Sequence, residues 1–131
     1  VDQLLASRGF ARRMAYAFDA VLMERRKDAK VPRAEWESYL RESFAANKRY
    51  DQLVRELLSA DGADAKRRGP AKFTLDRDAE PNLVTKDVGR LFLGRNLQCC
   101  QCHDHPQIEH FTQAEYYGIY AFVARTSLFP N

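Results

Sequence analysis

Apolar residues recur at intervals of three and four along most of the 131-residue chain, which is the spacing of one face of an α-helix. Five stretches carry this pattern, and we expect each to turn its apolar face toward a core. They lie within residues 10–22, 36–44, 50–58, 83–92 and 112–123. The only alternation typical of a strand is in the four residues Lys72-Phe73-Thr74-Leu75, which permit a short strand and no more. The sequence predicts an all-α fold of about five helices.

Particular residues mark where these helices begin and end. The motif Thr112-Gln113-Ala114-Glu115 predicts a capping box, in which the Thr112 hydroxyl accepts a first-turn amide and Glu115 reaches back. Gly94 stands where a left-handed residue would end the fourth helix. Residues 61–80 have no helical pattern. We expect a long irregular loop there, which is unusual in a compact domain unless it is functional or mobile.

Length and charge limit the classes of protein to consider. A chain of this size predicts one domain, residues 1–131, with a single hydrophobic core. The net charge of +3 is too small to favour nucleic acid or an anionic membrane as partner. No apolar run is long enough to predict a membrane span. The first residues, VDQLLASRGF, have the character of a helix already begun, so we expect either a removed export signal or a piece of a longer protein.

All three cysteines and all three histidines of the chain lie in one segment, residues 97–111. Cys99, Cys102 and His103 spell C-x-x-C-H, the attachment pattern of a c-type haem. On one helical turn these positions share a face, so both thiols could form thioethers while His103 binds the iron as proximal ligand. The other ring nitrogen of His103 would then need a partner, and a backbone carbonyl is favoured over the Asp104 carboxylate. Cys100 is expected to be a buried free thiol.

Other chemistries of this cluster remain open. A redox-active C-x-x-C pair of the thioredoxin type follows a strand, whereas here a helix precedes it. A structural zinc site built from Cys99, Cys102, His105 and His110 would be cramped, because zinc ligand pairs normally flank a longer loop. A disulfide with a spare thiol is the third alternative. The motif favours haem over all three.

The chain resembles a known family most closely over residues 79–129, on the motifs QCHDHP and TQAEYYG. It is similar to the planctomycete cytochrome-associated domain of unknown function, the second planctomycete cytochrome-type domain, which occurs in large exported proteins. The resemblance implies a mainly helical domain, located in the periplasm or outside the cell, with haem positions at Cys99, Cys102 and His103. It implies no reaction. His105 matches the family's second histidine, whereas His110 is particular to this chain.

A haem at this motif would need a second axial ligand or an open iron face. His110 is the candidate distal ligand, because the chain between it and His103 is long enough to reach the opposite haem face. Met14 is assigned to the core of its helix and Met23 to the surface. His105 is too close to His103 to cross the ring, and could bond a propionate or reach a neighbouring subunit. Candidate wall residues, most of them individually better explained as helix core, are Phe92, Phe111, Tyr116, Tyr117, Tyr120 and Phe122. Candidate propionate partners are Lys86, Arg90 and Arg95.

These observations lead to one favoured function and two alternatives. The favoured hypothesis is a monohaem c-type cytochrome, with haem c (iron) as cofactor, that carries single electrons outside the cytoplasm. It would exchange electrons with a redox partner protein or with copies of itself in a homo-oligomer or filament. The alternatives are a haem sensor with an open sixth position and a structural or recognition module that binds zinc. An electron carrier is favoured over a catalyst, because no acid–base or nucleophile set stands out.

Overall fold

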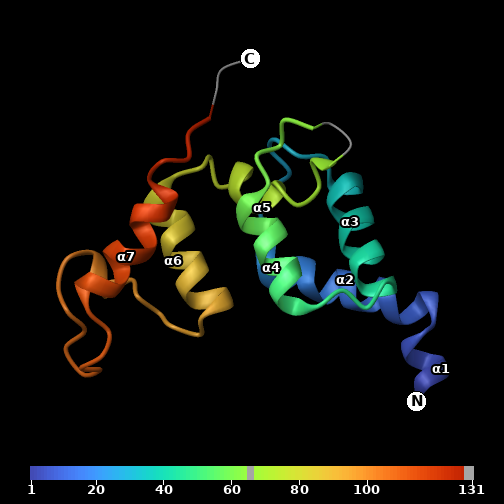
Figure 1. Cartoon of the computed structure of the whole chain (residues 1–131), viewed down its shortest axis with the longest axis horizontal. Coiled ribbons are helices and arrows are strands. Elements are labelled where there is room, and N and C mark those ends of the chain that lie inside the picture. Colours follow the sequence, from blue (N-terminus) through green and yellow to red (C-terminus); the bar gives the residue numbers. More distant parts are fainter. Residues whose placement is uncertain (65–66, 129–131) are drawn as a thin grey trace. The chain divides into compact units, whose positions relative to one another are not determined.

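The computed structural model describes residues 1–64 and 67–128, and within them it contains seven α-helices and no strand (Figure 1). The helices are α1 (Asp2–Leu5), α2 (Arg8–Met23), α3 (Arg33–Ala45), α4 (Tyr50–Ser59), α5 (Lys72–Leu75), α6 (Pro81–Phe92) and α7 (Gln113–Val123). A 3-10 turn, η2 (Cys99–Gln101), precedes α7. The predicted all-α class is confirmed, and the five longer helices coincide with the five periodic segments. None of the described helices is long and apolar enough to cross a membrane.

The prediction of a possible strand at residues 72–75 is wrong, because these residues form α5. The alternation of apolar and polar residues misled it, since alternation predicts a strand only when the polar residues face water. Lys72 does not, because its side chain is 2% exposed and lies 2.9 Å from Asp28 in an ion pair. The irregular loop predicted over residues 61–80 is therefore interrupted by a helical turn.

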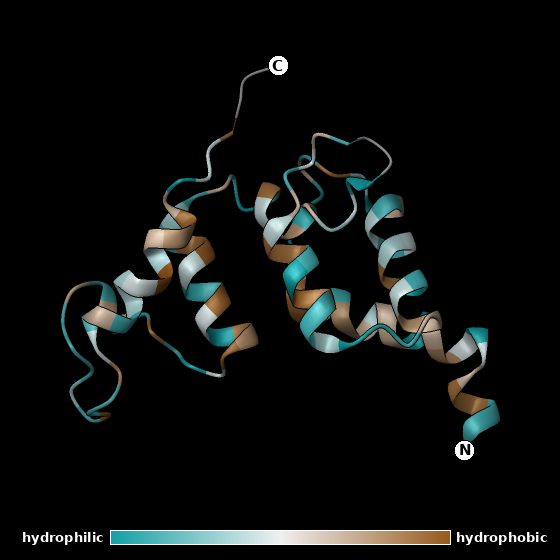
Figure 2. Cartoon of the chain, in the orientation of Figure 1, coloured by the Kyte–Doolittle hydropathy of each residue, from teal (hydrophilic) through white to brown (hydrophobic). Residues whose placement is uncertain are grey.

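The chain divides into two compact units, Val1–Asp76 and Arg77–Asn131, and each is described by itself. In the N-terminal unit α2 packs against α3, and α4 packs against α5. Figure 2 shows hydrophobic and hydrophilic residues sharing each of the long helices, as the periodicity requires. The buried side chains of this unit include Trp36, Leu40, Leu53, Leu57 and Phe73. The assignment to one domain rests on chain length and stays a prediction.

Two residues at the end of α2 differ from expectation. Val21 lies within the periodic stretch 10–22 that is expected to face the core, yet it is 56% exposed. Met23, which the sequence assigns to the surface, is 2% exposed. The buried face of α2 runs through Ala11, Ala15 and Leu22, which turns Val21 away from the core. Met23 is the last helical residue before Glu24 takes a left-handed conformation (φ 48°), so its burial no longer follows the helical repeat.

A network around Asp76 fixes the connection that follows α2. Its carboxylate pairs with the buried Lys72 and accepts the backbone N–H groups of Lys30 (2.8 Å) and Val31 (3.2 Å). Burial by itself would raise the pKa of Asp76, but these hydrogen bonds outweigh burial and lower it. Lys72 also donates to the Val31 carbonyl oxygen over 2.8 Å. The segment before α3 is thereby tied to α5.

In the C-terminal unit, α6 and α7 lie side by side (Figure 1). At the start of α6, the Glu80 side chain accepts hydrogen bonds from the N–H groups of Asn82 and Leu83. The helix ends before Gly94, whose φ is 65°. The prediction of a left-handed residue at Gly94 is therefore confirmed. Thr112 caps α7 by accepting the Glu115 N–H at 3.3 Å, which is one half of the predicted capping box. The side chain of Glu115 does not complete it, since it pairs instead with Arg95.

Candidate haem-attachment site

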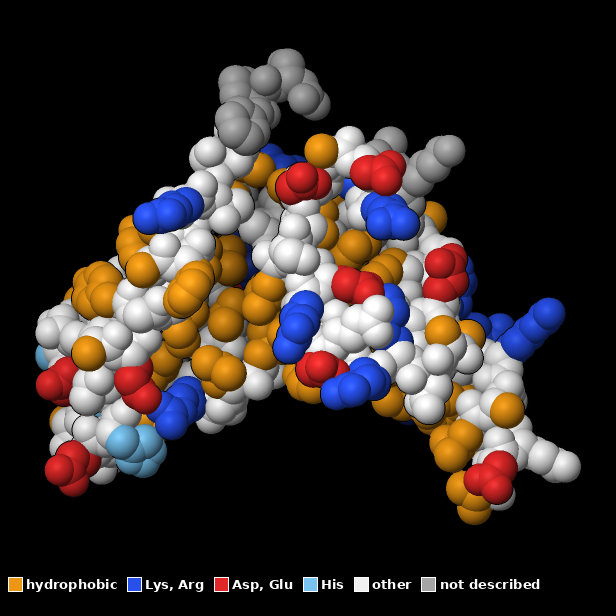
Figure 3. Space-filling model, viewed as in Figure 1, with side chains coloured by type: hydrophobic (Ala, Val, Ile, Leu, Met, Phe, Trp, Pro, Cys, Tyr) orange, Lys and Arg blue, Asp and Glu red, His pale blue; other side chains and the backbone are white. Residues whose placement is uncertain are grey.

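Residues 99–103 form one turn that presents both thiols and the imidazole of the motif. The backbone N–H groups of Cys102 (3.1 Å) and His103 (3.2 Å) donate to the Cys99 carbonyl oxygen, so the turn is helical in character. Cys99, Cys102 and His103 are exposed, whereas Cys100 is fully buried. Figure 3 shows histidine side chains at the surface of the C-terminal unit. The prediction that Cys100 is a buried free thiol is confirmed.

Cys100 is a core residue rather than a reactive one. It packs in a cluster with Leu97 and Tyr116, and its Sγ lies 3.3 Å from the carbonyl oxygen of Phe111. Burial is the main cause that raises the pKa of the Cys100 thiol. The thiol therefore stays protonated at neutral pH and anchors the middle of the turn to the core.

Two hydrogen bonds join the turn to both long helices of its unit. The Gln101 side chain donates to Asn82 Oδ1 in α6 over 3.2 Å, and the Tyr117 hydroxyl in α7 donates to the Gln101 carbonyl oxygen over 2.9 Å. Asn82 Oδ1 also accepts the Tyr116 hydroxyl at 2.9 Å. Burial raises the pKa of Tyr116 to about 12, so this hydroxyl remains a donor. Sequence reasoning missed Asn82 entirely, because nothing in the pattern of α6 distinguishes it.

The His103 ring has the backbone partner that was expected. Its Nδ1 lies 2.7 Å from the Asp104 carbonyl oxygen, and only a protonated Nδ1 can donate in this contact. The tautomer with the proton on Nδ1 leaves the lone pair on Nε2, the form in which histidine binds a metal. The Asp104 carboxylate accepts the Gln113 N–H over 2.7 Å and so caps the first turn of α7.

His105 closes the loop that follows the turn. The ring Nδ1 of His105 accepts hydrogen bonds from the backbone N–H groups of Gln107 (3.2 Å) and Ile108 (3.1 Å). The backbone N–H of His105 donates to the Phe111 carbonyl oxygen at 2.8 Å. The ring meets the Phe111 ring edge-on, with centroids 5.9 Å apart. These contacts give His105 a structural role in shaping residues 105–111. The sequence suggested instead a zinc ligand, a contact with a propionate or a contact with a neighbouring subunit.

His110 is exposed, and its ring meets the Phe111 ring edge-on with centroids 4.9 Å apart. Within the described residues, no group of three or more His, Cys, Asp or Glu side chains converges as metal ligands do. The four ligands considered for zinc thus do not come together here. In addition, the Nδ1 atom of His105 already accepts a hydrogen bond from the Gln107 N–H.

The candidate wall residues separate into core and surface. Tyr116 is fully buried, with Phe111 and Tyr120 packed against its cluster, and Phe92 is half-buried. Tyr117 is 47% exposed and Phe122 is 86% exposed. Tyr117 is therefore the wall candidate that is both exposed and bonded to the turn.

The three candidate propionate partners have other surroundings. Arg95 pairs with Glu115 and lies 5.6 Å over the Phe111 ring. Arg90 pairs with Asp87 at 2.9 Å, and Lys86 is half-buried.

Comparisons with known proteins place the chain in a family without assigning a reaction. No curated protein and no solved structure matches it. A family model, described as PSCyt2, protein of unknown function (DUF1549), matches residues 1–127, which is nearly the whole chain. The chain belongs to the PSCyt2 family, a planctomycete cytochrome-associated domain of unknown function.

Proposed function

We propose that this chain is a monohaem c-type cytochrome domain that carries single electrons. The observation that carries the proposal is the Cys99–His103 turn, which exposes two thiols and one imidazole together. The hydrogen bond from His103 Nδ1 to the Asp104 carbonyl supports it, because it leaves Nε2 as the coordinating atom. This donor set fits the covalent attachment and proximal ligation of a haem c.

Each residue of the turn has a defined part in this proposal. The thiols of Cys99 and Cys102 would each add across one haem vinyl group, with sulfur and hydrogen going to the two vinyl carbons, so that attachment needs no oxidant. His103 Nε2 would be the proximal iron ligand. Bound haem supplies a one-electron couple between Fe(II) and Fe(III). The Asp104 carbonyl would orient the imidazole and strengthen it as a donor.

The surroundings of the turn support a rigid attachment site. Cys100 anchors it in the core, and Gln101 is held by Asn82 and Tyr117. A rigid site suits electron transfer, since small structural change between the two oxidation states keeps the exchange fast. The exposed position of the thiols and of His103 leaves the site open to a redox partner protein or to another copy of the chain, in a homo-oligomer or filament.

Two further parts of the proposal concern the second axial position and the location. His110 is the proposed distal ligand, and a five-coordinate haem sensor is the alternative if that position stays open. Haem is attached to C-x-x-C-H outside the cytoplasm, so we place the domain in the periplasm or outside the cell.

The test is the absorption spectrum of protein produced by an exporting host that attaches haem c, recorded in alkaline pyridine after reduction. A haemochrome band that persists through acid–acetone extraction is the expected result for covalent haem. Cys99→Ser and Cys102→Ser should each remove one thioether and shift that band toward that of a single linkage. Cys100→Ser is the matched control and should leave the band unchanged.

A protein without any haem band would contradict the proposal. The same sample would then be analysed for zinc, and one equivalent of zinc that is lost in Cys99→Ser and Cys102→Ser would identify a structural or recognition module instead.

A further inference from the structure

Helix α7 is apolar around most of its circumference, but its own unit packs only one side of it. Among its 11 residues, only Gln113 and Glu115 carry an amide or a charge. The packed side is centred on the fully buried Tyr116, with Ile119 and Tyr120 against the same cluster. A helix that is apolar on all sides is normally buried on all sides. The opposite side of α7 is therefore expected to pack against something further.

This opposite side is a continuous, uncharged surface, which we call the α7 face. Its residues recur three and four positions apart and are all exposed: Ala114, Tyr117, Gly118, Ala121 and Phe122. Phe122 is 86% exposed, more than a single surface aromatic needs to be. Figure 3 shows hydrophobic side chains gathered on the C-terminal unit where Figure 1 places α7. A contiguous apolar surface of this kind marks an interaction site rather than ordinary surface.

The α7 face is complementary in size to a second copy of itself. Ala114, Gly118 and Phe122 are spaced by four residues and form one ridge of the helix, with a small residue in the middle. When two copies cross antiparallel at Gly118 around a two-fold axis, Phe122 of each copy lies over Ala114 of the other. A large side chain then meets a small one at both ends, and the small residue at the crossing lets the helix axes approach to about 8 Å. A parallel pair would instead set Phe122 against Phe122.

The two ends of the α7 face carry opposite charges. Arg125 comes directly after the last turn of α7, and Glu109 lies in the loop before its first turn. Both are exposed, and within the described residues neither takes part in an ion pair. In the antiparallel pair, Arg125 of one copy lies beside the loop that carries Glu109 in the other, whereas a parallel pair brings like charges together. Charge and size therefore select the same partner and the same orientation.

We propose that the α7 face is the contact surface of a homodimer, in which two copies pair antiparallel through α7 around a two-fold axis at Gly118. A contact of this kind uses the same surface on both copies, so it closes as a dimer and does not extend into a filament.

The pairing would bring both candidate attachment sites close to the contact. Tyr117, on the α7 face, donates to the Gln101 carbonyl oxygen of the turn over 2.9 Å. Because Gly118 directly follows Tyr117, the turn of each copy lies near the two-fold axis. A second copy is then the redox partner that the haem of the first copy meets. This consequence rests on the proposed function, whereas the pairing itself involves no haem.

The test is sedimentation equilibrium of the full chain, with and without haem, at roughly 1–100 µM protein. The expected result is a reversible equilibrium that reaches the mass of two chains. Phe122→Glu places a charge in the contact and should weaken the dimer about tenfold or more. Tyr16→Glu is the matched control, because Tyr16 is a 60% exposed aromatic residue of α2 in the N-terminal unit. It should leave the dimer dissociation constant within about twofold.

A charge exchange tests the antiparallel orientation. Arg125→Glu alone should weaken the dimer about threefold or more, because two acidic groups then meet at each end of the contact. Arg125→Glu combined with Glu109→Arg should restore the dissociation constant of the parent. Circular dichroism of each variant checks that its helices are retained.

Three results would overturn the proposal. They are a chain that stays monomeric over the whole concentration range, a Phe122→Glu variant that dimerises as the parent does, and a charge-exchanged double variant that dimerises no more tightly than Arg125→Glu alone. The mass of the particle and the haem band are separate measurements, so the dimer and the proposed haem function can fail independently.

Discussion

His103 and Asp104 are joined by a contact of 2.7 Å between the imidazole Nδ1 and the neighbouring carbonyl oxygen. The same Asp104 caps α7 through its carboxylate, which accepts the Gln113 N–H. One residue therefore orients the proposed iron ligand and anchors the segment that carries it to a helix. This double role connects the stability of the C-terminal unit with the geometry of the candidate site.

Replacing Asp104 should destabilise the protein without removing any proposed ligand. Asp104→Ala loses the hydrogen bond to the first turn of α7, and we expect a loss of about 1 kcal/mol in the free energy of unfolding, measured in urea. Asp104→Asn keeps an accepting oxygen and should recover most of it. Glu109→Ala, at an exposed position in the same loop, is the control and should change little. An Asp104→Ala variant as stable as the parent would show that the cap is unimportant.

Replacing His110 tests the proposed distal ligand in the haem-loaded protein. We expect the parent to show a six-coordinate, low-spin spectrum, and His110→Ala to shift to a high-spin form that binds carbon monoxide. Met14→Leu is the control, since Met14 is a half-buried residue of α2 and was assigned to packing. If His110→Ala keeps the low-spin spectrum, the second ligand comes from another residue or another molecule.

Acid should weaken the network around Asp76. Its pKa in the folded protein is lower than the ordinary value of 3.8, because hydrogen bonds from Lys72, Lys30 and Val31 outweigh the effect of burial. The ionised carboxylate thus contributes stability that is fully present above about pH 4 and is lost as the pH falls through the folded pKa. Urea unfolding measured from pH 7 down to about pH 2 should show this loss.

The variant Asp76→Asn should remove that part of the acid dependence. At neutral pH it should cost about 3 kcal/mol, because the buried Lys72 loses one of its two carboxylate partners. Asp51→Asn, which breaks an exposed pair with Arg49, should leave both the stability and its pH profile close to those of the parent. An unchanged acid profile in Asp76→Asn would contradict the assignment.

Two helical glycines should respond in opposite directions to alanine. At Gly89 a Cβ would lie 2.9 Å from the Arg95 carbonyl oxygen, so Gly89→Ala should destabilise by about 1–3 kcal/mol. At Gly118 in α7 nothing lies within 4 Å of an added Cβ, so Gly118→Ala should stabilise by about 0.5–1 kcal/mol through helix propensity. Thermal unfolding measures both effects. A stabilising Gly89→Ala would show that the Arg95 carbonyl oxygen does not pack as closely against Gly89 as the 2.9 Å distance indicates.

The helices were predictable wherever they were long enough to repeat. The five longer helices each show several turns of apolar spacing, and such spacing reports directly on which face is buried. α1 and α5 have four residues each, too few for a repeat. The burial of Lys72 in α5 depends on Asp28 and Asp76, so no local pattern announces it.

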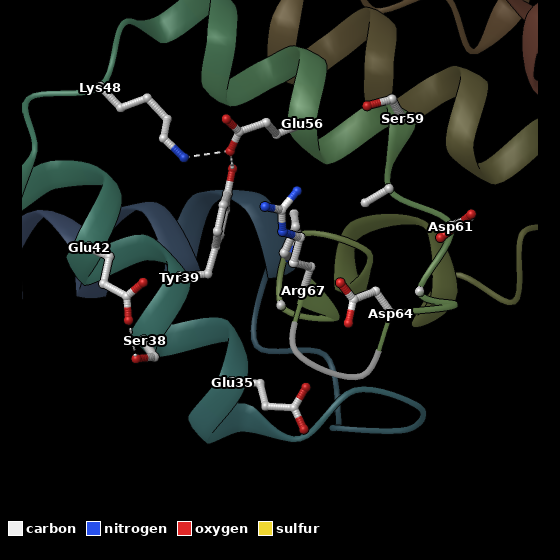
Figure 4. Close-up of a pocket in the computed structure, with 14 residues that line it drawn as sticks. Glu35, Ser38, Tyr39, Glu42, Lys48, Glu56, Ser59, Asp61, Asp64 and Arg67 are labelled. Carbon is white, nitrogen blue, oxygen red and sulfur yellow. Dashed lines mark hydrogen bonds and ion pairs between the residues drawn. The ribbon is translucent and has the colours of Figure 1, made fainter.

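By itself, the sequence determined the helical class and the order of the two thiols and the imidazole on the Cys99–His103 turn, because both depend on residues three or four positions apart. The tertiary structure alone decided which groups hold that turn. Asn82 and Tyr117 bond to the turn from α6 and α7, the helices before and after it in the sequence. The carbonyl oxygen of Phe111 accepts hydrogen bonds from the Cys100 thiol and the His105 backbone N–H. The N-terminal unit also has a cavity lined by residues of α3, α4 and the segment after α4 (Figure 4), which is visible only once these elements are packed. Contacts of this kind join residues that the chain brings together only by folding, so no spacing along the sequence encodes them.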